Sequence, residues 1–265
     1  MAVNSAPVYD CDLRIAELYD QSEASVDDVA LILSLIGGLG PLRILEPFCG
    51  TGRMLIPLAL AGHELVGLDH SRGMLARAEG KVASLSPAVQ ERITLIEADV
   101  MRGKWPPGFD LVILGGNCFY ELATPEEQEG CVASAAQALR PGGTIYVDND
   151  HMEGELDESW RQPGVRDAFP AAVCADGTRV TSSIETIWYD GPARLARFRR
   201  RTTLTSPDGE TVERDYIQQK HPVSTAEVRS WLIAHGFVVE RLYGDWDGTP
   251  YTSPSERAIF WARRR

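Results

Sequence analysis

The sequence predicts an α/β protein built on a parallel β-sheet with helices on both faces. Three observations lead to this fold class. Apolar segments of strand length alternate with helical segments over residues 1–150, these apolar segments contain few polar positions, and turns rich in glycine or proline separate them. With 265 residues, of which 44% are hydrophobic, the chain is long enough to bury a large core.

Local capping signals place the elements of residues 1–150. Ser71 is a suitable N-cap, Thr124 opens a capping box with Pro125 in the first turn, and Gly62 is a suitable C-cap. Helices are therefore expected over residues 8–36, from 54 to Gly62, from 71 to 82, and from 124 to the turn 139–143. The apolar runs predict strands at 43–46, 64–69, 93–99, 110–115 and 144–148.

The pattern changes after Asp150. Residues 151–177 are rich in acid, proline and glycine and are expected to be irregular. Three alternating segments then predict an antiparallel insert, at residues 178–189, 194–205 and 211–221. A capping box at Ser224 opens a helix that ends at Gly236, and two last strands, 237–243 and 256–262, flank the loop 244–255 as an edge hairpin. The prediction is a Rossmann-like seven-stranded mixed sheet in residues 1–150 and 222–265, with the insert 151–221 after strand five.

Charge and composition exclude several classes of partner. The net charge of −12 repels nucleic acid and anionic membranes, and the longest apolar run, residues 29–36, is too short to span a bilayer. The amino-terminal segment has no secretory pattern, so we expect a cytoplasmic protein. A monomer or a homodimer is expected as its oligomeric state. The five cysteines contain no C-x-x-C pair, which predicts free thiols and neither disulfides nor a metal site.

The loop after the first strand indicates a ligand site. Gly50 and Gly52 lie between a parallel strand and a helix, at the edge of the sheet where open α/β folds bind ligands. A dinucleotide fingerprint needs a third glycine at position 55, which is Leu55. Asp69, at the end of the second strand, suits ribose hydroxyls in either a nicotinamide cofactor or an adenosine. Asp99, at the end of the third strand, suits an adenine amino group and favours the adenosine.

These segments resemble the motifs of class I S-adenosylmethionine-dependent methyltransferases of the small-molecule type. The resemblance covers about residues 9–262, and Phe48 departs from it by replacing the first glycine of the loop. The segments that carry it, in order, are 46–52, 67–69, 96–100, 109–113 and 139–143. The resemblance implies a cofactor, S-adenosylmethionine, and a set of residues around it: Tyr19, Glu46, Cys49, Gly50, Gly52, Asp69, His70, Met74, Asp99, Val100, Gly115 and Asn117.

Methyl transfer from a sulfonium needs alignment of donor and acceptor, and it needs a base only when the nucleophile arrives protonated. His151, just after strand five, is the candidate base, and Tyr120 is a candidate for orienting the acceptor. The insert and the loop 244–255 are expected to form the pocket of a small-molecule acceptor. Its candidate residues are Trp160, Trp246, Tyr251 and His221.

We therefore expect an enzyme that methylates a nitrogen or an oxygen of a small metabolite. Two alternatives remain open from the sequence. One is a protein that binds S-adenosylmethionine without catalysis, and the other is an NAD-dependent oxidoreductase.

Overall fold

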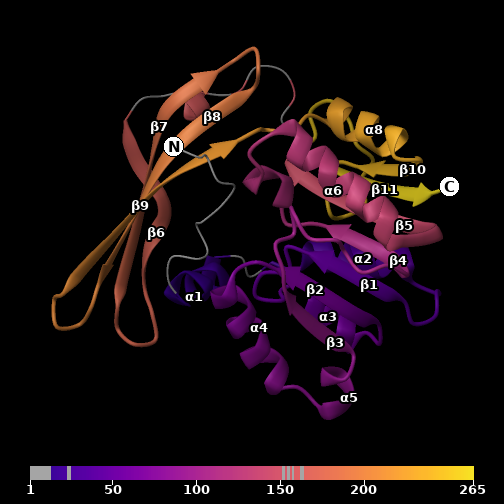
Figure 1. Ribbon diagram of the computed structural model, residues 1–265, viewed down its shortest axis with the longest axis horizontal. Helices are drawn as coiled ribbons and strands as arrows, with labels where there is room; N and C mark the ends of the chain where they lie inside the picture. The colour runs from indigo at the N-terminus through magenta and orange to yellow at the C-terminus, as the bar shows by residue number, and fades with distance from the viewer. Residues whose placement is uncertain (1–12, 23–24, 151–152, 154–155, 157, 162–163) are drawn as a thin grey trace.

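The chain forms two β-sheets that lie side by side (Figure 1). This is a computed structural model, and it describes residues 13–22, 25–150, 153, 156, 158–161 and 164–265. Within these residues, a seven-stranded sheet carries helices on both faces, and a four-stranded sheet stands beside it.

The seven-stranded sheet has the predicted mixed topology. Strands β1 to β5 run parallel to one another, and β11 pairs antiparallel with both β5 and β10. The order across the sheet is β10-β11-β5-β4-β1-β2-β3, so the hairpin expected from the last two apolar segments closes one edge. The strands are β1 (Arg43–Pro47), β2 (Glu64–Asp69), β3 (Ile93–Glu97), β4 (Phe109–Leu114), β5 (Leu139–Asp150), β10 (Phe237–Tyr243) and β11 (Arg257–Arg264).

The helices predicted from capping signals at Ser71, Thr124 and Ser224 begin where expected. The segment 8–36 differs from the prediction, and three short helical segments, at residues 87–90, 118–121 and 158–161, had not been predicted. The expected helical segment 8–36 contains two helices, α1 (Leu13–Ser22) and α2 (Asp27–Ile36), in its described part. The Ser71 side chain accepts a hydrogen bond from the Met74 amide, and Ser224 forms a complete capping box with Glu227. The other helices are α3 (Leu55–Leu60), α4 (Arg72–Ala83), α5 (Pro87–Gln90), the 3₁₀ turn η2 (Cys118–Glu121), α6 (Pro125–Ala138), α7 (Glu158–Arg161) and α8 (Thr225–Ala234).

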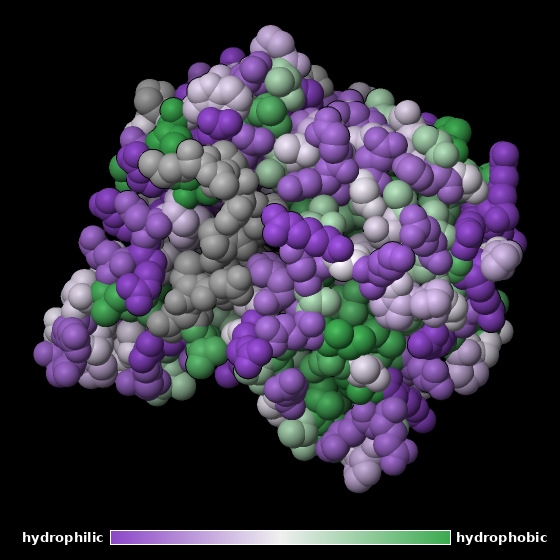
Figure 2. All heavy atoms as spheres, viewed as in Figure 1, coloured by the Kyte–Doolittle hydropathy of each residue, from purple (hydrophilic) through white to green (hydrophobic). Residues whose placement is uncertain are grey.

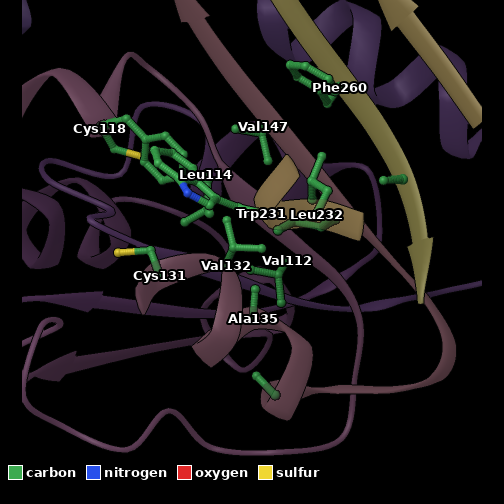
Figure 3. Close-up of a cluster of buried hydrophobic side chains, with 14 of the residues drawn as sticks. Val112, Leu114, Cys118, Cys131, Val132, Ala135, Val147, Trp231, Leu232 and Phe260 are labelled. Atoms are coloured by element: carbon green, nitrogen blue, oxygen red, sulfur yellow. The ribbon is translucent and has the colours of Figure 1, made fainter. Parts of the chain in front are cut away.

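Alternation along the strands divides the core between the two faces of the large sheet. On one face, Val112 and Val147 pack with Val132 of α6 and Leu232 of α8 (Figure 3). The opposite face packs against α2 and α3, in a cluster that includes Ile32, Leu58, Leu111, Ile113 and Tyr146. Both faces are therefore buried, as the continuous apolar strands predict.

The insert has one strand more than predicted. The described residues of the insert form β6 (Val165–Val173), β7 (Arg179–Asp190), β8 (Leu195–Thr205) and β9 (Thr211–Lys220), in that order. The expectation that 151–177 is irregular was wrong over the single helical turn α7 and over β6. Strand β6 pairs antiparallel with β7 through two register shifts. The side chains of β6 do not alternate as those of a typical strand do. Backbone hydrogen bonds to β7 therefore stabilise the strand in place of a side-chain pattern. Pro170 is compatible with this position because β6 is an edge strand.

The surface is mostly hydrophilic on the face shown in Figure 2, with an apolar area over β2 and β3. No helix in the described ranges is both long and apolar enough to cross a membrane.

Candidate functional site

A cavity of about 370 Å³ lies at the carboxyl ends of β1, β2 and β4. Ten of the twelve residues expected around a cofactor line it, all of them in described parts of the chain. They are Tyr19, Glu46, Cys49, Gly50, Asp69, His70, Met74, Asp99, Val100 and Gly115. Because these residues come from five separate segments, their convergence is produced by the parallel sheet, which brings its strand ends to one edge.

The glycine loop at the floor of this cavity is held by Asp69. The Gly50 amide donates to one carboxylate oxygen of Asp69 at 2.8 Å, and the Ser71 amide donates to the other at 2.8 Å. Gly50 has a φ of +52°, which glycine adopts without cost. Phe48 has a φ of +63°, the left-handed region that a glycine would favour, and its side chain lines the cavity. Phe48 thus has the left-handed backbone conformation typical of glycine while carrying a large side chain.

Leu55, which stands where a dinucleotide site needs glycine, packs tightly against β2. An added Cβ on Gly67 would lie 2.7 Å from the Leu55 side chain and 2.7 Å from the Cys49 sulfur. The close approach of helix and strand is therefore provided by a glycine in the strand, and not by one in the helix. This arrangement leaves the loop intact without the dinucleotide fingerprint.

Glu46, at the end of β1, is a buried carboxyl group with an unsatisfied atom. The residue is 5% exposed, and its Oε2 has no hydrogen-bond partner among the residues that the structure describes. Burial raises the pKa of Glu46 to about 8, and the charges of Asp28 and Asp69 act in the same direction. A cationic ligand group in the cavity would satisfy this oxygen and favour its ionised form.

Arg53 borders the same part of the cavity but is already paired. Its guanidinium donates two hydrogen bonds to the Asp28 carboxylate, at 2.9 and 2.6 Å, and a third to the Ser25 carbonyl at 2.7 Å. Burial alone would lower the pKa of Arg53, but Asp28 raises it above its ordinary value. The pair joins the amino terminus of α2 to the start of α3.

The opposite end of the cavity is open to solvent at Asp99. This carboxylate is about half exposed and accepts hydrogen bonds from the Met101 and Arg102 amides, at 3.0 and 3.1 Å. Val100 is buried, and its carbonyl accepts from the Trp105 indole at 3.0 Å. His70 also lines this end, with Nδ1 3.8 Å from Asp69.

Helix α1, which carries Tyr19, is attached to the glycine loop by the neighbouring Asp20. The Asp20 carboxylate accepts from Thr51 Oγ1 at 2.6 Å, Lys81 Nζ at 2.6 Å and Arg77 Nε at 2.8 Å. Burial alone would raise the pKa of Asp20, but these hydrogen bonds and the Lys81 charge lower it overall. A cluster of charge-assisted bonds therefore positions Tyr19 at the cavity.

The two remaining residues of the expected cofactor set support the cavity without lining it. Gly52 has a φ of +77° and bonds back to the Cys49 carbonyl at 2.9 Å. Asn117 has a φ of +57°, and its Oδ1 accepts from the Asp150 amide at 2.8 Å, which ties the ends of β4 and β5 together. Cys49 and Cys118 border the cavity, and burial raises the pKa of both groups, as expected for packed thiols.

Of the residues predicted for catalysis and for the acceptor, those that the structure describes do not line the cavity. Tyr120 and Trp160 contact each other edge to face, at 5.4 Å between ring centres, in an apolar cluster of the insert. The buried His221 has Nδ1 2.7 Å from Gln128. Trp246 donates to Asp148 at 2.8 Å, and the Tyr251 hydroxyl lies 3.4 Å from Thr225 Oγ1. His151, the predicted base, lies outside the described residues.

Other residues of the cavity wall had not been predicted. They are Arg53, Met54, Met101, Arg102, Cys118, Glu121, Leu122 and Glu127, together with Phe48, which had been noted only as a departure from the family pattern. Gly116, expected beside Gly115, also lines the wall. Arg53 directly follows the glycine loop, so its position could have been inferred. Glu121 has no such local signal, because its partners come from β9, almost one hundred residues later.

The fold and the cavity define an α/β protein with a candidate ligand site at the carboxyl edge of its parallel strands. Residues 44–143 match the family model described as "Methyltransferase domain". Cypemycin N-terminal methyltransferase from Streptomyces sp is 25% identical over 259 residues, which cover 96% of this chain and 97% of that protein.

Two solved structures extend the similarity to the insert. An S-adenosylmethionine-dependent methyltransferase from Clostridium acetobutylicum aligns with a TM-score of 0.72 at 16% identity, covering 95% of this chain and 98% of that one. The sugar N-methyltransferase KedS8 from Streptoalloteichus sp aligns with a TM-score of 0.71 at 20% identity, covering 100% and 99%. Residues 44–143 therefore match a methyltransferase domain, and nearly the whole chain has the fold of solved S-adenosylmethionine-dependent methyltransferases.

Proposed function

We propose that the protein is an enzyme that transfers the methyl group of S-adenosylmethionine to a nitrogen or oxygen of a small-molecule acceptor. The observation that carries this proposal is the cavity itself. It joins the glycine loop and Asp69 to a second, acidic wall that contains Glu121 and Glu127. A protein that only binds the cofactor needs no second polar wall, whereas an enzyme needs one to bind the acceptor.

The charges of the cavity fit the cofactor. Among the described residues of its wall, five are acids and two are arginines, and one of these, Arg53, is paired with Asp28. Such a wall favours a ligand that carries a sulfonium and an ammonium, and it disfavours the pyrophosphate of NAD. The unpartnered Oε2 of Glu46 would accept from the ammonium group. Asp69 would hold the ribose, Asp99 and Val100 the adenine, and Tyr19 would cover the cofactor from α1.

The chemistry needs few dedicated groups. When bound, the cofactor supplies a methyl group on a sulfonium whose departure leaves a neutral thioether. The chain contributes alignment, because the rigid loop and the cavity wall hold donor and acceptor in line. His151 stays our candidate for accepting a proton from a protonated nucleophile. Replacing it by alanine should reduce turnover sharply and leave cofactor affinity nearly unchanged.

The insert and the end of η2 form the acceptor side in this proposal. The insert, residues 151–221, acts as a lid. Support comes from the attachment of β9 to the cavity wall, where Gln218 and Lys220 bond to Glu121. The proteins that align over the insert include one named as a sugar N-methyltransferase and one named cypemycin N-terminal methyltransferase. The contacts of Tyr120 and Trp160 favour a packing role within this lid over direct contact with the acceptor.

Calorimetric titration with S-adenosylmethionine, S-adenosylhomocysteine and NAD tests the cofactor part. We expect micromolar binding of the two adenosyl compounds and none of NAD. Transfer of labelled methyl groups to small amines and phenols then tests catalysis. Binding without any methyl transfer would support the alternative of a non-catalytic binding protein. If neither adenosyl compound binds, both the methyltransferase hypothesis and the non-catalytic alternative are refuted.

A further inference from the structure

The last residues of β9 and the residue after them are attached to the cavity wall by consecutive side chains. Gln218 donates to Glu121 at 2.5 Å, Gln219 donates to the Ala123 carbonyl at 2.9 Å, and Lys220 donates to Glu121 at 3.0 Å. His221 follows, with its ring nitrogen 2.7 Å from Gln128 and its amide on the Leu122 carbonyl at 3.3 Å. Four adjacent positions of the insert thus bind the segment from Glu121 at the end of η2 to Gln128 in the first turn of α6.

Glu121 is the member of this group that reaches the cavity. Its side chain is 25% exposed and lines the wall together with Leu122 and Glu127. Each of its carboxylate oxygens accepts one hydrogen bond, from Lys220 or from Gln218. A carboxylate has about four lone-pair positions, so each oxygen keeps one for a ligand.

Lys220 makes this carboxylate a permanent charge. The lysine is 1% exposed, and its ammonium lies 3.7 Å from the centre of the Tyr120 ring, which also favours a cation. Burial lowers the pKa of Lys220 to about 8, although Glu121 acts in the opposite direction. Burial alone would raise the pKa of Glu121, but Lys220 and the nearby Arg200 lower it below its ordinary value. Glu121 is therefore ionised at neutral pH.

A buried lysine–glutamate pair costs desolvation, and an apolar pair of the same volume would often be at least as stable. Its presence at the cavity is better explained by a requirement for an oriented carboxylate there. The adjacent Glu127 adds a second acid to the same wall, while its Oε2 accepts from the Ala123 amide at 2.7 Å. Two carboxylates beside the apolar Leu122 and Met101 suit an amine on a small organic molecule.

We propose that Glu121 binds the amino group of an amine acceptor, with Lys220 as its positioning residue, so that the protein is an N-methyltransferase. This inference rests on the proposed function. The carboxylate first binds the incoming ammonium group. After that group has lost one proton to solvent, the carboxylate accepts a hydrogen bond from an N–H of the neutral amine. The nitrogen lone pair forms the new N–C bond as the C–S bond breaks and its electrons stay on sulfur. The product leaves as the methylated ammonium, and Glu121 remains ionised throughout.

The test compares amine and hydroxyl probes of equal shape on the protein loaded with S-adenosylhomocysteine. Benzylamine is titrated against benzyl alcohol, and D-glucosamine against D-glucose, by calorimetry. We expect at least one amine to bind about tenfold more tightly than its alcohol, since a charge-assisted bond is worth about 1.4 kcal/mol or more. Glu121→Gln and Lys220→Met should reduce that ratio towards one. A merely structural defect would weaken amine and alcohol alike and leave the ratio unchanged.

Glu185→Gln is the matched control. Glu185 is an acid of the same insert that pairs with Arg199 at 3.1 Å outside the cavity, and this variant should keep the wild-type ratio. If Glu121→Gln fails to fold, Glu121→Asp retains the charge and should keep part of the preference. Equal binding of amine and alcohol, an unchanged ratio in both Glu121→Gln and Lys220→Met, or no binding of either amine overturns the inference. In all three cases binding of S-adenosylhomocysteine leaves the proposed function standing, whereas its failure to bind refutes the proposed function itself.

Discussion

The substitution Glu46→Gln distinguishes the effect of the buried carboxyl group on folding stability from its effect on cofactor affinity. Glu46 is 5% exposed, its Oε2 has no partner among the described residues, and burial raises its pKa from 4.5 to about 8. Glutamine has nearly the same shape and cannot ionise. The variant should therefore match the wild type in acid, where Glu46 is protonated in both the folded and the unfolded chain.

The magnitude follows from proton linkage. Because the pKa of Glu46 is raised on folding, the folded state holds the proton more tightly, and this stabilisation is complete below the unfolded pKa of 4.5. It is lost as the pH rises through about 8, at about 1.4 kcal/mol for each pH unit. At pH 7, we expect Glu46→Gln to exceed the wild type by roughly 3 kcal/mol in unfolding free energy, and the difference should level off above pH 8.

Urea unfolding of both proteins between about pH 5 and pH 9 measures this difference, and the contributions of other titrating groups largely cancel. Calorimetry with S-adenosylmethionine on the same samples should show weaker binding by the variant, because the ligand ammonium loses its carboxylate. A difference in stability that does not change with pH would refute the reasoning. So would a wild type that is more stable than the variant at pH 7, since Glu46 would then be ionised and paired, with Arg53 as the nearest candidate.

Three further substitutions test the loop and its cover. Asp69→Ala should weaken S-adenosylmethionine binding by about 1–3 kcal/mol in calorimetry, because it removes both the acceptor of the Gly50 amide and the proposed ribose contact. The exposed control Asp208→Ala should leave binding unchanged. Phe48→Gly should be more stable than Phe48→Ala by about 1 kcal/mol in urea unfolding, because only glycine relieves the φ of +63°; the opposite order would show that the backbone is unstrained there. Asp20→Asn should speed hydrogen exchange in α1 about tenfold and raise the cofactor Kd, since a helix this short is marginal alone; unchanged exchange would mean that the Asp20 contacts do not hold α1.

The part of the cavity that we assign to the cofactor could be predicted from the sequence because its signals are local. Glycines at positions 50 and 52, an acid at the end of β2 and another after β3 each follow a strand directly, and parallel strands place their ends together. Gly62, Ser71 and Ser224 marked helix boundaries for the same reason, since a cap is decided by its own turn.

The part of the cavity that we assign to the acceptor could not be predicted in the same way. Trp160, Trp246 and Tyr251 were attractive as aromatic pocket residues, but the fold directs each into packing or hydrogen bonds away from the cavity. Aromatic side chains pack in cores as readily as they line ligand sites, and their own sequence neighbourhood does not distinguish these fates. Strand β6 was missed for a related reason, because its hydrogen bonds come from β7 and not from its own pattern.

The sequence by itself determined the succession of strands in the seven-stranded sheet, the glycine loop, and the acids that follow β2 and β3 and line the cavity. Only the tertiary structure decided that Glu121 enters the cavity wall, that Lys220 holds it there, and that Oε2 of Glu46 is left without a described partner. The physical reason is distance along the chain. Caps, turns and strand periodicity depend on residues a few positions apart, whereas burial and pairing of a charge depend on segments that meet only when the two sheets are assembled.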